Sequence, residues 1–350
     1  MEVPGHMTTT QKPDAATHEI PAYEIPTHEI TRREISIGEI GPIRIGQAED
    51  VQAGTGCTVF LHDTGMHAGL DVRGGGPASR ETPLLSPLTA AQRIHGIVLA
   101  GGSAYGLSAA SGVMQYLRER DIGFDVGVTK VPLIVQSDLF DLTVGDPNVY
   151  PDEAMGYEAA RLAFEAPNYQ DGNFGAGCGA TVGKLCGMER CMKTGIGSFA
   201  AQIGELKIGA VVALNALGDV FEWRSGRQIA GMLTEDGTAF AGTSKEMRKS
   251  IAAVKNRFVA NTTLGVIITN ARFHKGSLCK IAGMGHDGYA RSIRPVHTSM
   301  DGDSIYAVSV GDVIADREVV GMMAAEVISE AITRAALRAG SAYGFPSAQS

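Results

Sequence analysis

The chain lacks long apolar runs, and it has few aromatic residues and no excess of positive charge. None of its apolar stretches approaches the ~20 residues that a membrane-spanning helix needs, and its first residues lack the basic-then-apolar pattern of a secretion signal. The formal net charge of −8 argues against a nucleic-acid-binding protein, because phosphate binding needs a basic face. We therefore expect a globular cytoplasmic protein without membrane or nucleic-acid partners.

The cysteines provide no framework for a metal site or for disulfides. The five of them lie at irregular spacings and form no CxxC pair. We expect small buried thiols in a reducing compartment, and neither a metal nor an organic cofactor. Glycine, in contrast, is abundant: 45 of the 350 residues are glycine, which suggests tight turns and closely packed layers.

The first residues differ in character from the rest of the chain. Residues 1–35 are polar, contain four prolines, and repeat a Glu-Ile pair every five residues, a repeat that continues to Glu39-Ile40. A period of five fits neither a helix nor a strand. We predict a loose N-terminal arm over residues 1–35, whose last repeats lead into the first strand, and a single domain over residues 36–350.

Strands and helices follow one another irregularly in this domain. Short apolar runs between turn residues predict strands, and apolar residues at helical spacing predict helices. Residues 225–257 are polar and indicate an exposed connection. Without regular βαβ alternation, the order favours a layered α+β fold or a helix–sheet–sheet–helix sandwich over a doubly wound sheet. The predicted strands cover residues 58–62, 96–100, 209–215, 263–270 and 304–310, and the predicted helices cover 104–120 and 319–339.

A glycine-rich turn follows the second predicted strand. Gly101, Gly102 and Ser103 precede a helix, but the segment is not GxGxxG and no Walker Lys-Ser/Thr follows it, so nucleotide binding is not expected. The backbone N–H groups at such a helix start can hold a carboxylate or an oxyanion.

The most informative segment is the junction of Asn261 and Thr262, which runs directly into the strand at 263–270. A hydroxyl residue at the head of a buried strand, after a long polar connection, is unusual for a loop. A threonine can attack its own preceding carbonyl through an N→O acyl shift and so release a new N-terminus. The freed α-amine has a pKa near ~8 and can accept the proton of its own hydroxyl. One residue would then supply both the nucleophile and the base.

This segment resembles the nucleophile region of the DmpA/BapA-type aminopeptidases and of the nylon-oligomer hydrolase NylC. The resemblance implies a four-layer αββα sandwich of the N-terminal-nucleophile-hydrolase type, cleaved into an α chain that ends at Asn261 and a β chain that starts at Thr262. It also implies a homo-oligomer of αβ units, commonly a tetramer, that needs no cofactor. It covers residues 43–339 and rests on motifs in the family order: 54–58 (GTGCT), 71–75 (DVRGG), 101–103 (GGS), the 261–262 junction and 300–303 (MDGD).

The resemblance assigns roles to five residues. Thr262 matches the nucleophile. Asp301 and Asp303 match an acidic pair that supports self-cleavage and orients the amine, although alone this Asp-Gly-Asp sequence is typical of a turn with outward carboxylates. Lys184 matches a lysine near the nucleophile and would otherwise be interpreted as a surface residue. Asn215 matches an asparagine whose amide supports the oxyanion, a donor typically worth ~3 kcal/mol; alone, it is typical of a turn at a strand end.

One position departs from the family pattern. The aminopeptidases and NylC carry a tyrosine whose phenol helps to form the oxyanion hole, and we align it with Phe140. Phenylalanine cannot donate a hydrogen bond. We therefore expect the oxyanion to rest on Asn215 and on backbone N–H groups, with Gly102 and Ser103 as the candidates.

Four further polar residues have weaker assignments. No relay partner is evident for His286 or His297, and His297 is expected to cap or pack beside the turn at Asp301. Asp71 and Arg73 are predicted either to form a structural pair or to line the pocket.

The expected function is hydrolysis of amide bonds in small peptides or amides that carry a free amine on the N-terminal side. The alternative with the same chemistry is a hydrolase of linear ω-amino-acid oligomers, as NylC is. The alternative of another class is a binding or scaffold protein of low activity on the same fold.

Overall fold

The computed structural model describes residues 32–249 and 261–350, and Arg32–Ser350 form one compact unit. The predicted arm lies outside the described residues, except for its last four. These four residues, Arg32–Ile35, form strand β1 and pair with a strand far along the chain. The compact unit therefore begins at Arg32, before the predicted start of the domain at residue 36.

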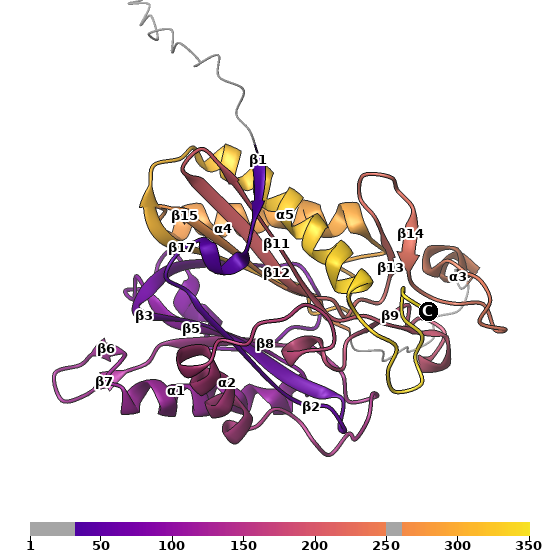
Figure 1. The fold of residues 1–350 in the computed structure, drawn as a ribbon, viewed down its shortest axis with the longest axis horizontal. Helices are drawn as coiled ribbons and strands as arrows, with labels where there is room; N and C mark the ends of the chain where they lie inside the picture. Colours follow the sequence, from indigo (N-terminus) through magenta and orange to yellow (C-terminus); the bar gives the residue numbers. More distant parts are fainter. Residues whose placement is uncertain (1–31, 250–260) are drawn as a thin grey trace, which may run out of the picture. The chain divides into compact units, whose positions relative to one another are not determined.

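Two β-layers share one long strand, β3 (Thr55–Val72) (Figure 1). The first half of β3 pairs with β2 and β5, and its second half pairs with β17. The first layer follows the order β1, β11 (Ile196–Ile203), β12 (Leu206–Ala213), β15 (Leu264–Ala271), β17 (Ser304–Val313) and β3. The second layer contains β2 (Arg44–Asp50), β3, β5 (Ile94–Ala100), β8 (Ile134–Asp138) and β4 (Ala78–Arg80).

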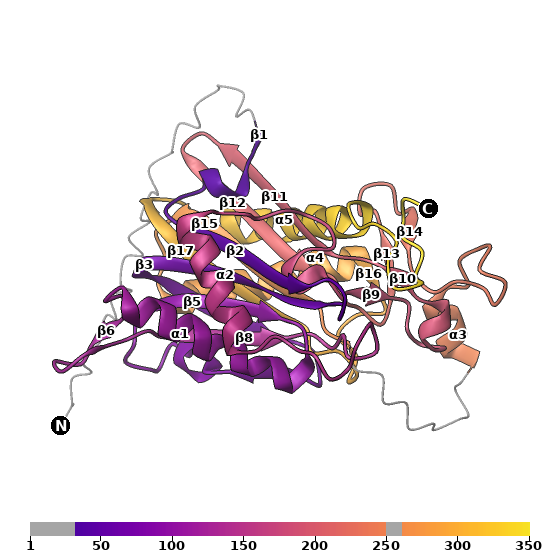
Figure 2. The same cartoon turned by 60° about the horizontal axis from the view of Figure 1, so that its bottom comes forward.

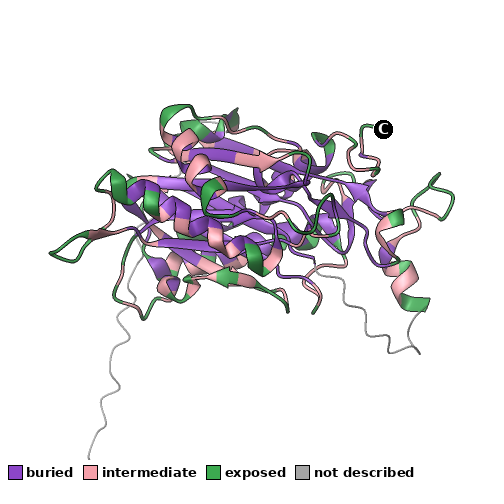
Figure 3. Cartoon of the chain, turned by 90° about the horizontal axis from the view of Figure 1, so that it is seen from below, coloured by how far each residue is buried: buried purple, intermediate pink, exposed green. Residues whose placement is uncertain are grey.

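Two pairs of helices cover the outer faces of these layers (Figures 1 and 2). The buried apolar residues accordingly form three principal clusters. One lies between the first layer and helices α4 (Lys275–Ser292) and α5 (Arg317–Leu337), one lies between the two layers, and one lies between the second layer and helices α1 (Ala109–Glu119) and α2 (Glu153–Glu165). The buried residues occupy the middle of this arrangement in Figure 3. The predicted αββα sandwich is thus confirmed.

The remaining short elements lie around these layers. Strands β13, β14 and β16 form a small antiparallel sheet, and the other short strands form two-residue pairs. In the described part of the chain, no helix is long and apolar enough to cross a membrane. The bounds are β6 (Phe124–Asp125), β7 (Lys130–Val131), β9 (Thr181–Val182), β10 (Met192–Lys193), β13 (Asp219–Phe221), β14 (Gln228–Ala230), α3 (Thr243–Lys249) and β16 (Ile293–Arg294).

The prediction of an exposed connection over residues 225–257 is wrong for part of its described length. Met232 and Thr243 are fully buried. The reason is the carboxylate of Asp219, which accepts hydrogen bonds from the backbone N–H of Met232 at 2.9 Å and of Thr243 at 2.6 Å. A single buried acid therefore draws a polar segment onto the domain, which composition alone does not indicate. Residues 250–257 lie outside the described residues.

The helix predicted over residues 104–120 begins differently from the prediction. Ser103–Ser108 form 3₁₀ turns, and the α-helix starts only at Ala109. The other predicted strands and the final helix are present, with bounds that differ by a few residues from the predicted ones.

Candidate active site

Thr262 lies immediately before β15, in the middle of the first layer, and only 4% of it is exposed. The end of β12 and the beginning of β17 flank it, because β12 runs antiparallel and β17 runs parallel to β15. Asn215 follows β12, and Asp301 and Asp303 precede β17. These side chains therefore meet the junction where the three central strands β12, β15 and β17 have their ends side by side. The backbone N–H of Thr262 donates to the carbonyl oxygen of Asn215 at 3.0 Å.

The peptide bond between Asn261 and Thr262 is held by the turn that precedes β17. The N–H of Gly302 donates to the Asn261 carbonyl oxygen at 2.9 Å, and the N–H of Asn261 donates to the Met300 carbonyl at 3.0 Å. The Thr262 hydroxyl also bonds to the Asn261 carbonyl oxygen. The Thr262 hydroxyl, the Asn261 carbonyl and a backbone donor to that carbonyl are therefore in contact. Sequence reasoning did not identify Gly302, because a backbone N–H leaves no residue-type signal.

Lys184 is buried, not exposed, and reaches Asn215. Its Nζ donates to the side-chain oxygen of Asn215 and, at 3.3 Å, to the backbone oxygen of the same residue. Burial lowers the pKa of Lys184 to about 8, and the negative charge of Asp301 opposes this shift. The interpretation of Lys184 as a surface lysine is thus excluded.

The side chain of Asn215 bridges three segments. Besides accepting from Lys184, its oxygen accepts the N–H of Thr181 at 3.1 Å, and its amide nitrogen donates to the Phe140 carbonyl at 2.9 Å. In the uncleaved chain this amide therefore orients the backbone of Phe140. Its role as an oxyanion donor stays a prediction.

Both carboxylates of the Asp-Gly-Asp turn point inward, and each aspartate is 1% exposed. Asp303 accepts the N–H of Thr263 at 2.9 Å through one oxygen. Asp301 accepts from the N–H of Leu217 at 3.3 Å and from both the N–H and the hydroxyl of Thr298. Burial and the neighbouring charge of Asp303 raise the pKa of Asp301 to about 6. The alternative of a turn with outward carboxylates is thus excluded.

The glycine-rich turn does not supply oxyanion donors in this form, which corrects the expectation for Gly102 and Ser103. The N–H of Gly102 donates to the Asp141 carboxylate at 2.7 Å, and the N–H of Ser103 donates to the Leu139 carbonyl at 3.0 Å. Sequence reasoning missed Asp141, a buried acid whose pKa burial raises to about 6. It lies next to Phe140 in residues 138–142 (DLFDL), and an acid between apolar residues is the signal that could have identified it.

The weaker candidates lie close to this site. The ring of His297 bonds to Asp303, and that of His286 bonds to the Asp71 carbonyl oxygen at 3.1 Å. Burial lowers the pKa of His286 to about 4. Asp71 and Arg73 form a half-exposed ion pair at 2.9 Å, and Arg73 also donates to a carbonyl of α4, which favours the structural interpretation of this pair.

The cysteines are only partly as predicted. Three of them are buried, Cys279 is half-buried, and Cys186 is exposed, so the expectation of buried thiols is wrong for Cys186. Within residues 32–249 and 261–350, no cluster of three or more His, Cys, Asp or Glu side chains could hold a metal ion.

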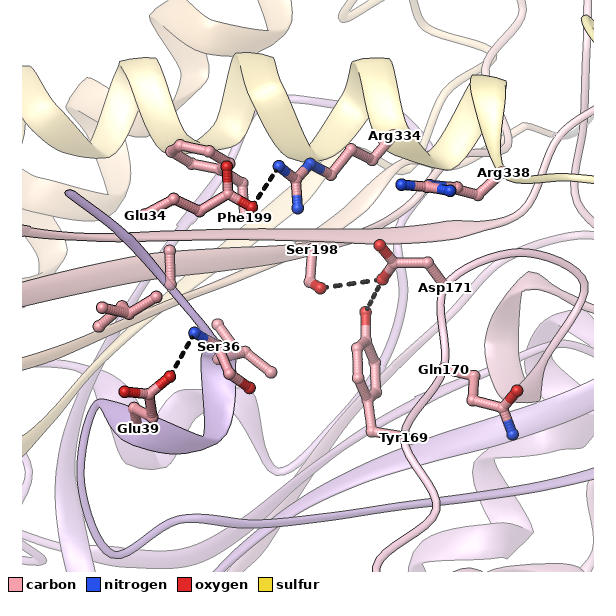
Figure 4. Close-up of a pocket in the computed structure, with 13 residues that line it drawn as sticks. Glu34, Ser36, Glu39, Tyr169, Gln170, Asp171, Ser198, Phe199, Arg334 and Arg338 are labelled. Atoms are coloured by element: carbon pink, nitrogen blue, oxygen red, sulfur yellow. Dashed lines mark hydrogen bonds and ion pairs between the residues drawn. The ribbon is translucent and has the colours of Figure 1, made fainter.

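A cavity of about 730 Å³ lies away from the junction, between β1, β11 and the end of α5 (Figure 4). Asp171 accepts hydrogen bonds there from Tyr169 and Ser198, both at 2.9 Å, and Arg334 pairs with Glu34. None of the residues expected at the catalytic site lines this cavity.

Comparisons with known proteins identify the family of the chain. Residues 36–349 match peptidase family S58. The chain is 36% identical over 313 residues to an uncharacterized aminopeptidase of Mycobacterium leprae, covering 83% of this chain and 84% of that one. It is 29% identical over 310 residues to a 6-aminohexanoate-oligomer endohydrolase of Kocuria, covering 84% of each chain.

Solved structures share the fold at lower identity. An L-aminopeptidase D-Ala-esterase/amidase from Ochrobactrum anthropi, described as a prototype for the serine aminopeptidases and a variant of the Ntn-hydrolase fold, superposes with a TM-score of 0.62 at 18% identity over 88% of each chain. A β-aminopeptidase from Burkholderia gives a TM-score of 0.61 at 18% identity over 89% of each chain. The fold is thus that of an Ntn hydrolase, and the chain belongs to peptidase family S58, a family of peptide and amide hydrolases.

Proposed function

We propose that this protein cleaves its own chain between Asn261 and Thr262 and then hydrolyses amide bonds with Thr262 as an N-terminal nucleophile. One observation carries the proposal: the Thr262 hydroxyl, the Asn261 carbonyl and the Gly302 N–H are in contact within a buried site. An ordinary loop does not require a threonine hydroxyl to contact the preceding carbonyl oxygen while a third group donates a hydrogen bond to the same oxygen.

Self-cleavage would begin with attack of the Thr262 oxygen on the Asn261 carbonyl carbon. The N–H of Gly302 then stabilises the negative charge that develops on the carbonyl oxygen, as an oxyanion-hole donor does. The C–N bond breaks, the nitrogen takes a proton, and an ester links Asn261 to the Thr262 oxygen. Water hydrolyses this ester, which gives a carboxylate at Asn261 and a free amine at Thr262.

The freed amine completes the mature catalytic centre. It takes the proton of the Thr262 hydroxyl as that oxygen attacks a substrate carbonyl, and water later releases the acyl group. In the uncleaved chain the carbonyl oxygen of Asn215 accepts a hydrogen bond from the N–H of Thr262, and the carboxylate of Asp303 accepts one from the adjacent N–H of Thr263. These two acceptors are suited to orient the amine. Lys184 donates to the carbonyl oxygen of Asn215, the same oxygen that accepts the N–H of Thr262. Its positive charge is our candidate for stabilising the developing oxyanion.

The substrates that we propose are small peptides or amides with a free amine at the N-terminal side. The relatives named as aminopeptidases favour this class, and the relative that hydrolyses 6-aminohexanoate oligomers favours the alternative of ω-amino-acid oligomers. We further propose a cytoplasmic homo-oligomer of αβ units, with a tetramer as the first arrangement to examine.

A substrate panel tests the proposal. Purified protein would be incubated with α-aminoacyl anilides, β-aminoacyl anilides and 6-aminohexanoate oligomers, and product would be measured by chromatography. We expect turnover of aminoacyl anilides, and none by a Thr262→Ala variant. A fully cleaved protein that hydrolyses no member of the panel would support a binding role on this fold instead.

Replacement of Gly302 by alanine should slow self-cleavage strongly. A Cβ at this position would lie 2.5 Å from the Thr262 hydroxyl oxygen and 2.8 Å from the Gly76 carbonyl oxygen. The hydroxyl must therefore move away from the carbonyl that it attacks, and a misplacement of ~1 Å can cost ~100-fold in rate. The measurement is the rate at which freshly synthesised precursor disappears on a denaturing gel.

The matched control for this change is Gly276→Ala. Gly276 lies in the first turn of α4, and a Cβ there would meet no atom within 4 Å. This variant should cleave at the wild-type rate. Equal rates for the two variants would contradict the placement of the hydroxyl beside Gly302.

A further inference from the structure

His297 contacts one member of the acidic pair, Asp303, through two separate donors. Its backbone N–H donates to one carboxylate oxygen of Asp303 at 3.1 Å, and its ring Nδ1 bonds to the same oxygen at 2.8 Å. The other oxygen of Asp303 accepts the N–H of Thr263 at 2.9 Å. Asp303 thus joins His297 to the residue that follows the nucleophile.

The backbone of His297 adopts a conformation that few side chains tolerate. Its φ is +57°, in the left-handed region that asparagine and aspartate occupy more readily than most residues. This conformation allows the backbone N–H and the ring of the same residue to reach one oxygen. A cap would need only the backbone N–H, so the ring bond calls for a further explanation.

Neighbouring rings fix the imidazole in place. The ring of His286 lies 4.7 Å away at an interplanar angle of 73°, and that of Tyr289 stacks at 5.9 Å. Both come from α4, and His286 is in turn held by the Asp71 carbonyl at the end of β3, beside Arg73. The loop that contains His297 also contains two carboxylates, those of Asp303 and Asp301. Packing therefore determines the ring orientation, and the ring in turn determines the orientation of the carboxylate.

We propose that His297 is a positioning residue for the nucleophile. It holds the Asp303 carboxylate so that one oxygen stays directed at the N–H of Thr263, the residue next to the nucleophile, both in the precursor and after cleavage. A buried carboxylate is stable and well oriented only when several donors hold it. Loss of the ring donor would leave Asp303 with two backbone donors and a freer side-chain rotation. This inference rests on the proposed function, because it assigns His297 to the self-cleaving site.

The test compares His297→Asn with His297→Ala. Asparagine tolerates the positive φ, and its Nδ2 occupies nearly the position of the imidazole Nδ1, so it can donate to Asp303. Alanine removes the donor. The precursor would be made by cell-free synthesis and followed by gel, and kcat and KM for an aminoacyl anilide would be measured on the cleaved forms.

We expect H297A to cleave itself about 10- to 100-fold more slowly, and H297N to remain within about threefold of wild type. In the cleaved H297A enzyme, kcat should fall while KM stays within about twofold, because Asp303 acts on the nucleophile and not on the substrate. His274→Ala, at an exposed helix start without a side-chain cap bond, should match wild type.

Two results would overturn this role. One is self-cleavage of H297A at the wild-type rate. The other is an H297N variant that folds with a normal melting temperature and yet cleaves as slowly as H297A. If H297A does not fold, H297N alone decides, since a folded H297N that is more than tenfold slower contradicts a donor role. The proposed function fails separately, if Thr262→Ala is still cleaved at the same bond.

Discussion

A Thr262→Ala variant is expected to remain one chain of 36.7 kDa and to have no amidase activity. The wild-type chain should instead yield fragments of ~27 and ~9 kDa, in proportion to the lengths of residues 1–261 and 262–350. Intact mass spectrometry measures both outcomes directly, and N-terminal sequencing of the small fragment should begin with Thr-Thr-Leu.

The effect should be large because one oxygen atom serves both reactions. Among the described residues, the printed donors to the Asn261 carbonyl oxygen are the Thr262 hydroxyl and the Gly302 N–H, and a backbone N–H cannot act as a nucleophile. Without cleavage, the nitrogen of Thr262 remains an amide and cannot act as a base. Loss of the nucleophile in a hydrolase of this kind can cost ~10⁶-fold in kcat.

Two control variants separate the hydroxyl from the local structure. Thr262→Ser keeps the hydroxyl and should still cleave. Thr263→Val removes the adjacent hydroxyl, which has no hydrogen-bond partner in the described structure, and keeps a β-branched side chain of similar volume. It should cleave normally. Cleavage of Thr262→Ala at the same bond would refute the assignment of the nucleophile.

The fold could be predicted largely from the sequence because its layers leave local signals. The buried strands β5, β12, β15 and β17 are short apolar runs between turn residues, and α5 is a long apolar helix that begins at an acidic cap. What could not be predicted is how polar residues are buried. Asp219 draws a polar segment onto the domain, and this effect depends on contacts between residues far apart in sequence.

In the candidate site, too, some features have a local sequence signal and others depend on tertiary contacts. Thr262, Asp301 and Asp303 were predicted through their motifs, and the structure brings them together with Lys184 and Asn215. The donors could not be predicted, because hydrogen bonding of a backbone N–H depends on tertiary structure. For this reason the expectation for the glycine-rich turn was wrong, since Asp141 already occupies it, and Gly302 was overlooked.

The pH dependence of self-cleavage offers a second decisive measurement. In the precursor the nitrogen of Thr262 is an amide, so no α-amine titrates at this site, and the profile reports side chains alone. Burial raises the pKa of Asp301 to about 6 and lowers that of Lys184 to about 8. These two groups therefore change charge on either side of neutral pH, inside the contact network of the scissile bond.

The direction of each limb follows from the charge that the site needs. Below a pH of about 6, Asp301 gains a proton, weakens as an acceptor for Leu217 and Thr298, and loosens the turn that holds Gly302. Above about 8, Lys184 loses the positive charge to which we assign stabilisation of the developing oxyanion. We expect a bell-shaped rate profile with a maximum between these values, falling up to ~10-fold per pH unit beyond each limb.

Lys184→Met isolates the alkaline limb of this profile. The rate should fall ~100- to 1000-fold at neutral pH, in the range seen when one oxyanion-stabilising group is lost, and the decline above a pH of about 8 should disappear. Folding should survive, because replacing a buried charge by an apolar side chain of similar length removes a desolvation cost along with the bonds to Asn215. The measurement is precursor decay between pH 5 and pH 10, with melting temperatures at each pH. Should Lys184→Met retain the alkaline decline, another group titrates there, and the positive charge of Lys184 does not assist the cleavage.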